Sequence, residues 1–210
     1  RNSGYTDSRF TSFCYSDFAA WLSAPPLSNG RSPFGGANPL DVAPIPAGLA
    51  WLAAQVPGGF TIQFVTLQLF MAIALMVLAV AVFKLRTSRP LDSSLLLLLP
   101  LWVLTMYVSS DIVAVAFAAC ALLLWKKQQP VLAGLFTGLA LASGAWTWLL
   151  LAVFIVDALR EGHRTAAIRT SLVAIAIAFI ANSPRLLAHQ PLLDKFDFQA
   201  GEGTLLFVAT

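Results

Sequence analysis

The feature that most constrains this chain is a series of apolar runs separated by short basic clusters. The runs cover 62–83, 93–107, 111–125, 130–159 and 168–180. Several of them approach the roughly 20 residues that a membrane-spanning helix needs. Apolar residues make up 58% of the sequence and charged residues only 11%, whereas soluble domains usually carry about 25% charged residues. The sequence therefore predicts an all-α, polytopic integral membrane protein surrounded by membrane lipids.

The charge distribution argues against a nucleic-acid partner. The net charge is +3, and the basic residues stand beside apolar runs, where they mark membrane topology rather than a nucleic-acid surface. The sequence has no glycine-rich phosphate loop, no His/Cys metal spacing and no Ser–His pair with an orienting third group. We therefore expect neither a metal ion nor a cofactor.

Turn-forming residues and apolar runs divide the chain into three parts. Residues 1–60 are rich in Gly, Pro, Ser and Asn and predict an extracytoplasmic loop with short helices, one of them at 46–55. Residues 61–184 predict a transmembrane helical bundle, and 185–210 predict an outer loop that leads into a further span. Because the sequence begins at Arg1 rather than Met, we expect a fragment of a longer chain.

The run 130–159 differs from the other apolar runs because basic residues flank both of its ends. About 30 residues at 1.5 Å each are too few to cross a membrane twice as full helices. The run therefore predicts two shorter helices that meet near Ser143 and Gly144 and form a hairpin that dips through the membrane. The last span is expected to end at Pro184.

The loop cations predict the orientation of the chain. By the positive-inside rule, the following residues face the cytoplasm: Lys84, Arg86, Arg89, Lys126, Lys127, Arg160, Arg164 and Arg169. The first loop, the turn before Asp111 and the tail after Asn182 then share the extracytoplasmic side. The acids of these segments converge there: Asp7, Asp17, Asp41, Asp111, Asp194, Asp197 and Glu202. Because polar groups at membrane depth usually serve function, we expect an extracytoplasmic active site in a multi-pass plasma-membrane protein.

Carboxylates and a few outer cations are the groups that remain for chemistry. A carboxylate takes a proton from an acceptor hydroxyl as a general base. A cation such as Arg185 or Lys195 stabilises a departing phosphate. This pairing favours group transfer from a lipid phosphate.

Two of the carboxylates also have a structural interpretation. Asp17 opens a helix expected at 16–22 and is either a helix cap or a catalytic base. Asp111 follows two serines, caps the next helix and suits its N-terminal dipole, with a contribution to the site as the alternative. The residues alone leave both alternatives open.

Small and aromatic residues carry two further predictions. Small-residue spacing around Gly134, Gly138 and Gly144 indicates close helix packing. Five tryptophans predict a belt at the membrane interface, with a stacking surface for sugar rings as the alternative. They are Trp21, Trp51, Trp102, Trp146 and Trp148.

Three motifs together resemble one known family. They are Cys14-Tyr15-Ser16-Asp17 in the first loop, Asp111 followed by IVAVAFAACALLLWKKQQPVLAGLFTGLALA, and Asn182-Ser183-Pro184 with Phe196-Asp197-Phe198 in the tail. Through this pattern, which covers nearly the whole chain, the sequence resembles the actinobacterial glycosyltransferase family 87. Members of that family are polytopic enzymes of the GT-C class, related to polyprenyl-phosphate-mannose-dependent alpha-mannosyltransferases.

The resemblance implies a GT-C-like helical bundle with a structured outer first loop. It implies inverting transfer of a sugar, mannose or a pentose, from a polyprenyl-phosphate donor to a cell-envelope glycolipid or polysaccharide. A first-loop aspartate is the family's catalytic base, and Asp17 is the matching position here. The expected substrate-binding residues are Tyr15, Trp21, Asp111, Arg185 and Lys195.

Two hypotheses from other classes stay open. The first is a catalytically silent GT-C-like scaffold or complex subunit with membrane-protein partners. It is favoured by Gly144-Ala145-Trp146-Thr147, which stands where relatives carry Lys-Leu-Tyr-Pro. A cavity shared by the first-loop aspartate with the other site residues favours the enzyme instead. The second hypothesis, a transporter, is weaker because the spans are nearly free of charges and show no internal repeat.

Overall fold

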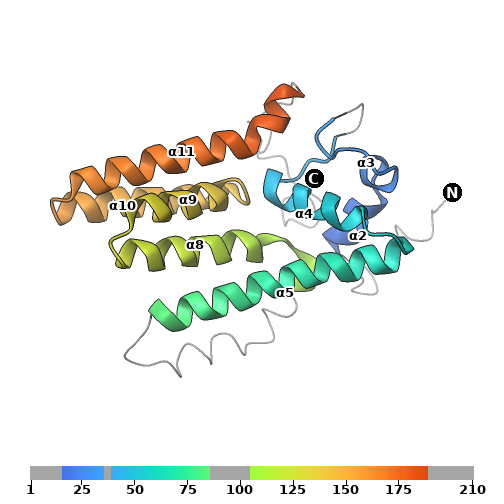
Figure 1. Cartoon of the computed structure of the whole chain (residues 1–210), viewed down its shortest axis with the longest axis horizontal. Coiled ribbons are helices and arrows are strands. Elements are labelled where there is room, and N and C mark those ends of the chain that lie inside the picture. The colour runs from blue at the N-terminus through green and yellow to red at the C-terminus, as the bar shows by residue number, and fades with distance from the viewer. Residues whose placement is uncertain (1–15, 36–38, 86–104, 189–210) are drawn as a thin grey trace, which may run out of the picture.

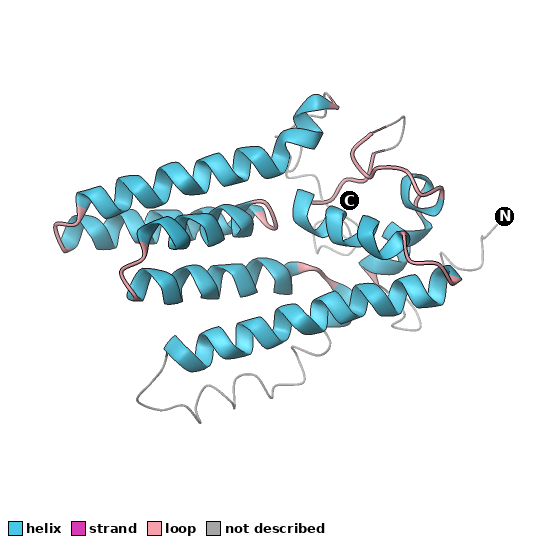
Figure 2. Ribbon diagram, viewed as in Figure 1, coloured by secondary structure: helices cyan, strands magenta, loops and turns pink. Residues whose placement is uncertain are grey.

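The part of the chain described by a computed structural model, residues 16–35, 39–85 and 105–188, contains helices and no strand (Figures 1 and 2). The all-α prediction is therefore confirmed for these residues. In chain order, the elements are α2 (Asp17–Ser23), α3 (Pro25–Ser28), α4 (Pro44–Ala54), α5 (Gly59–Leu85), α8 (Asp111–Lys126), α9 (Pro130–Leu141), η1 (Ala145–Thr147), α10 (Trp148–Arg160) and α11 (Arg164–Leu187).

Two of the helices, α5 and α11, are long and apolar enough to cross a membrane. They contain 27 and 24 residues, which correspond to about 40 Å and 36 Å of helix. Along α5, large apolar side chains that are 46–68% exposed recur every three or four positions: Ile62, Val65, Leu69, Ile73, Met76, Val80 and Phe83. Contact of such an apolar stripe with lipid is favourable, whereas its exposure to water is not.

The helix predicted at 111–125 forms as α8, but it is short. Its 16 residues correspond to about 24 Å, less than the roughly 30 Å of a bilayer's hydrocarbon core. Most of the span predicted at 93–107 lies outside the described residues.

The two shorter helices predicted at 130–159 and their meeting point near Ser143 and Gly144 are confirmed, while the dip of this hairpin through a membrane stays a prediction. Helices α9 and α10 are joined by a turn at Ser143 and Gly144 and by the short helix η1. Helix α9 lies between α8 and α11 and packs against both (Figure 1). The hairpin therefore begins and ends at the same end of the bundle, as its basic flanks predict.

Two glycines allow α9 to approach α11 closely, as the small-residue spacing predicts. A Cβ atom added at Gly134 would lie 2.6 Å from the carbonyl oxygen of Thr170, and one added at Gly138 would lie 2.6 Å from Cβ of Ile177. The buried Thr170 hydroxyl also donates to the carbonyl of Pro130 at 2.9 Å. At both glycines, α9 therefore comes close to backbone atoms of α11.

The predicted end of the last span at Pro184 is wrong, because α11 continues through this residue to Leu187. Proline has no N–H to donate to the carbonyl four residues before it, which here belongs to Ile180. The hydroxyl of Ser183 donates to that carbonyl at 2.7 Å instead. Neighbouring serine side chains make proline tolerable inside membrane helices in this way. Figure 1 shows α11 bending in its last turns, as expected at a proline.

The first loop is folded onto the bundle. Helices α2, α3 and α4 bury a shared apolar cluster against α5 and the start of α8: Phe18, Leu22, Leu27, Leu40, Val42, Ala47, Leu67, Met71, Ile112 and Val113. Burial of apolar surface in this cluster fixes the loop on one end of α5. The structured first loop is thus confirmed within the described residues, and it places polar side chains beside the start of α8.

Candidate functional site

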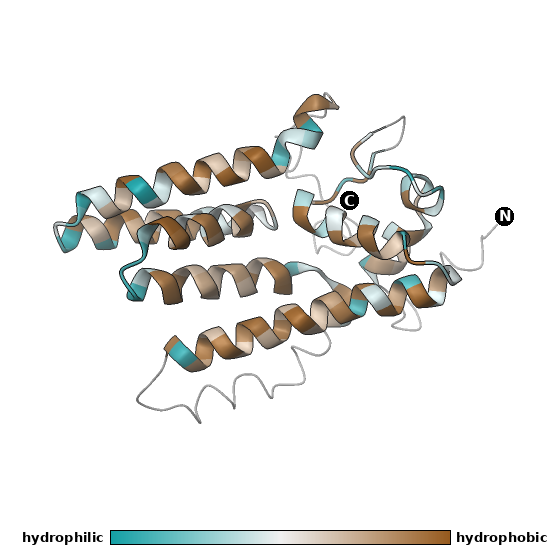
Figure 3. Ribbon diagram, viewed as in Figure 1, coloured by the Kyte–Doolittle hydropathy of each residue, from teal (hydrophilic) through white to brown (hydrophobic). Residues whose placement is uncertain are grey.

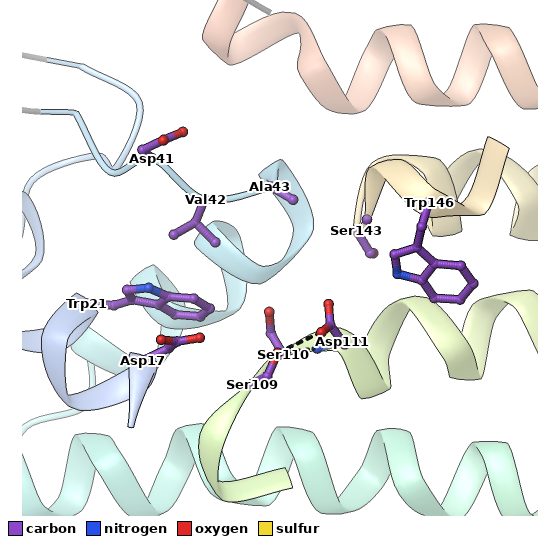
Figure 4. Close-up of a pocket in the computed structure, with 11 residues that line it drawn as sticks. Asp17, Trp21, Asp41, Val42, Ala43, Ser109, Ser110, Asp111, Ser143 and Trp146 are labelled. Carbon is purple, nitrogen blue, oxygen red and sulfur yellow. Dashed lines mark hydrogen bonds between the residues drawn. The ribbon is translucent and has the colours of Figure 1, made fainter. Parts of the chain in front are cut away.

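A pocket of about 440 Å³ lies between the first loop and the bundle (Figure 4). Its volume is in the range of small-molecule sites, roughly 300–1,000 Å³. Four segments that are far apart in the sequence line it: Asp17 and Trp21; Asp41, Val42 and Ala43; Ser109, Ser110 and Asp111; Ser143, Gly144 and Trp146.

Asp17 is presented to the pocket by the start of α2. Ser16 holds the N-cap position, but its hydroxyl donates to the carbonyl of Tyr107 at 2.8 Å and makes no cap hydrogen bond. This contact ties the start of α2 to the segment before α8. Phe18 is fully buried and meets Trp21 edge-on, with ring centroids 5.2 Å apart. Because the face of α2 that carries Phe18 is buried, the helix cannot rotate freely, and Asp17 and Trp21 are held at the pocket.

Asp111 is the first residue of α8, and Ser109 fixes its position. The Ser109 hydroxyl donates to Oδ2 of Asp111 at 3.0 Å and accepts from the Asp111 backbone N–H at 3.3 Å (Figure 4). The carboxylate also suits the positive end of the helix dipole. The residue remains exposed and lines the pocket, so its structural role leaves it available to a ligand.

The turn of the α9–α10 hairpin supplies the opposite wall. The backbone N–H of Ile45, at the start of α4, donates to the carbonyl of Ala142 at 3.3 Å. This bond holds the turn against the first loop. Figure 4 shows Trp146 across the pocket from Trp21. Gly144 and Trp146, on either side of the start of η1, therefore contribute to this pocket.

An ion pair borders the pocket. Arg185, on the last turn of α11, approaches Oδ1 of Asp41 at 3.4 Å. The arginine side chain is 7% exposed and the aspartate 79%. A guanidinium with so little exposure is held in place by the fold, whereas the carboxylate that it faces is free to contact solvent or ligand.

The described residues of the predicted site are close together. Asp17, Trp21 and Asp111 line one pocket, and Arg185 contacts it through Asp41. Two predicted residues, Tyr15 and Lys195, lie outside the described residues. The roles of all six stay predictions.

Sequence reasoning did not select Asp41, Ser143 and Trp146 as site residues. Asp41 is one of the predicted outer-face acids, and Trp146 is one of the tryptophans for which a stacking surface for sugar rings is the alternative interpretation. Ser143 stands at the predicted turn of the hairpin, which indicates its place in the fold but not a contact with a ligand.

The lining has a distinct chemical character. Three aspartates and three serines provide hydrogen-bond partners, two tryptophans provide flat apolar faces, and no lysine or arginine of the described ranges lines this pocket. No group of three or more metal-ligating side chains occurs within the described ranges. Such a surface suits a neutral ligand rich in hydroxyl groups.

No protein-family model matches this chain, and no curated protein or solved structure shows significant similarity to it.

Proposed function

We propose that this chain is a polytopic membrane glycosyltransferase of the GT-C class. It transfers a sugar, mannose or a pentose, from a polyprenyl-phosphate donor to a cell-envelope glycolipid or polysaccharide. The observation that carries the proposal is the pocket shared by Asp17 and Asp111, which come from distant parts of the sequence. The motif resemblance points to the same pair of residues.

The exposed apolar surface of α5 and α11 supports the placement in a membrane. The cations at the ends of α5, α8 and α10 and at the start of α11 lie at the other end of the bundle from the pocket (Figure 3). By the positive-inside rule this basic end faces the cytoplasm. The pocket then opens at the extracytoplasmic face of the plasma membrane, where lipid-linked sugars are used by the family that the sequence resembles.

In the proposed reaction, Asp17 accepts the proton of an acceptor hydroxyl as general base. The hydroxyl oxygen attacks the anomeric carbon, and a new C–O bond forms as the bond to the donor phosphate breaks. The electron pair of that bond leaves with the polyprenyl phosphate, and the configuration at the anomeric carbon is inverted.

The other residues bind rather than react. Trp21 and Trp146 offer apolar faces to sugar rings, and Asp111 accepts hydrogen bonds from sugar hydroxyls. Arg185, which borders the pocket through its ion pair with Asp41, is proposed to stabilise the departing phosphate. Tyr15 and Lys195 are proposed as further substrate contacts.

The test is transfer of radiolabelled sugar from polyprenyl-phosphate donors in membranes of a host that lacks this activity. We expect transfer by the full-length wild type and a loss of about a hundredfold or more in Asp17→Asn at matched expression. Glu161→Gln is the control, since Glu161 is an exposed carboxylate at the basic end. It should retain wild-type activity.

Two results would count against the proposal in different ways. Equal activity of wild type and Asp17→Asn would remove Asp17 from the mechanism. No transfer from any donor, by a folded protein that copurifies with a membrane partner, would favour the scaffold hypothesis instead.

A further inference from the structure

The end of the bundle remote from the pocket gathers cations from four helices. We call this group the basic end: Lys84, Lys126, Lys127, Arg160, Arg164 and Arg169. Helix α8 runs from Asp111 in the pocket to Lys126, so the two regions are separated by about 24 Å. Figure 3 shows hydrophilic residues at these helix ends and hydrophobic residues along the helices between.

Hydrogen bonds and ring stacking join three of the four helix ends, those of α5, α8 and α10, and α11 follows α10 after a short turn. Lys126 Nζ donates to the carbonyl of Leu85 at 2.8 Å and so joins α8 to the end of α5. Trp125 Nε1 donates to Oδ2 of Asp157 at 2.7 Å, and its ring stacks on Phe154 with centroids 4.7 Å apart. These contacts join α8 to α10. The cations are therefore presented as a group rather than on independent helix ends.

Within the described part of the chain, the charge of the basic end is not balanced by the acids beside it. Asp157 accepts from Trp125, and Glu161 is exposed beyond the end of α10. Six cations and these two carboxylates leave a net charge of +4 (6 − 2). Among the described residues, no ion pair joins any of the six cations to an acid.

Exposed apolar side chains lie directly next to these cations. They are Phe83 on α5, Val156 and Leu159 on α10, and Ile168 and Leu172 on α11. A soluble anion would engage the cations and leave this apolar surface in water. A phospholipid matches both parts, since its phosphate meets the cations while its acyl chains cover the apolar side chains.

We propose that the basic end binds anionic phospholipid, with headgroup phosphates seated among the cations of α5, α8, α10 and α11. The inference rests on the membrane placement of the proposed function and not on sugar transfer. Each lysine or arginine near an anionic membrane surface strengthens binding by about fivefold. Anionic lipid therefore surrounds this end of the bundle in preference to zwitterionic lipid, and it holds the four helix ends together.

The test uses the full-length protein in detergent, with native mass spectrometry to count bound phosphatidylglycerol and phosphatidylcholine. Wild type should retain phosphatidylglycerol in preference. Lys127→Gln, Arg160→Gln and Arg164→Gln combined should weaken that binding by about a hundredfold, because three charges are lost at about fivefold each. The matched control is Arg31→Gln, which removes an exposed cation outside the basic end and should leave lipid retention unchanged.

Further variants keep the test decisive. If the triple variant does not fold, Lys127→Gln alone should still cost about fivefold, since this side chain is exposed. Arg160→Lys with Arg164→Lys keeps both charges and should retain most of the binding. Equal retention of the two lipids by wild type, or equal loss in Arg31→Gln, would overturn the proposal. Binding of inorganic phosphate as tight as that of the lipid would assign the site to a soluble anion. Sugar transfer is not part of the readout, so its absence leaves this result interpretable.

Discussion

Replacing Gly138 with alanine tests the close approach of α9 to α11. The added Cβ would lie 2.6 Å from Cβ of Ile177 and 2.7 Å from the carbonyl oxygen of Ala174. Ordinary contact begins at 3.4 Å, so the closer pair falls short of it by 0.8 Å (3.4 − 2.6). Neither neighbour is the end of a flexible side chain. The helices themselves must therefore separate.

The expected loss of stability is the difference between two opposing effects. Overpacking a tight interface costs about 1–3 kcal/mol, while alanine improves helix propensity over glycine by about 1 kcal/mol. We expect Gly138→Ala to lower the free energy of unfolding by about 0–2 kcal/mol. At about 2–4 °C per kcal/mol for a chain of this size, the melting temperature falls by up to about 8 °C.

Gly48→Ala is the matched control, because it places the same substitution inside a helix with different surroundings. Gly48 lies within α4, and among the described residues nothing stands within 4 Å of an added Cβ. This variant gains the propensity without the clash and should melt at or above the wild-type temperature. The assay is thermal unfolding of the purified full-length protein in detergent. A Gly138→Ala protein as stable as Gly48→Ala would refute the described packing of α9 on α11.

Three further predictions concern single side chains. Ser183→Ala removes the donor to the carbonyl of Ile180 and should lower stability by about 1 kcal/mol, measured by thermal unfolding. Trp125→Phe keeps an aromatic ring but leaves the half-buried carboxylate of Asp157 without this donor. Its cost should be about 1–3 kcal/mol, and Asp157→Leu in the same background should recover part of it. Asp111→Asn should reduce sugar transfer while shifting stability by at most about 1 kcal/mol, because the residue is exposed in the first turn of α8. Unchanged transfer would show that Asp111 serves only to stabilise the start of α8.

The features that depend on local sequence were predictable. The basic flanks of 130–159 and its limited length predict the hairpin, and the glycine spacing in α9 predicts its packing on another helix. The length of a run, the charges at its ends and the spacing of its glycines can all be read from the sequence without knowing which helices lie next to it.

The end of α11 and the pocket lining depend on contacts that the sequence does not display. Proline usually marks a helix end because it lacks an N–H, yet Ser183 supplies the missing donor and the helix continues. Asp41 becomes part of the site only because Arg185 and the start of α8 lie beside it. Acids on the predicted outer face could be grouped from sequence. Which of them meet in one pocket is decided by how α2, α4 and the hairpin turn pack together.

The placement of α9 between two partners has a consequence for the order of biosynthesis. A helix of 12 residues is marginal by itself, and one side of α9 finds its partner on α8, which is already made. The other partner surface, around Ile177, lies 39 positions after Gly138 (177 − 138). At roughly 5–20 residues per second, translation reaches it about 2–8 s later. During that interval the glycine face of α9 lacks its partner helix, so the packing of α9 is completed only after α11 leaves the ribosome.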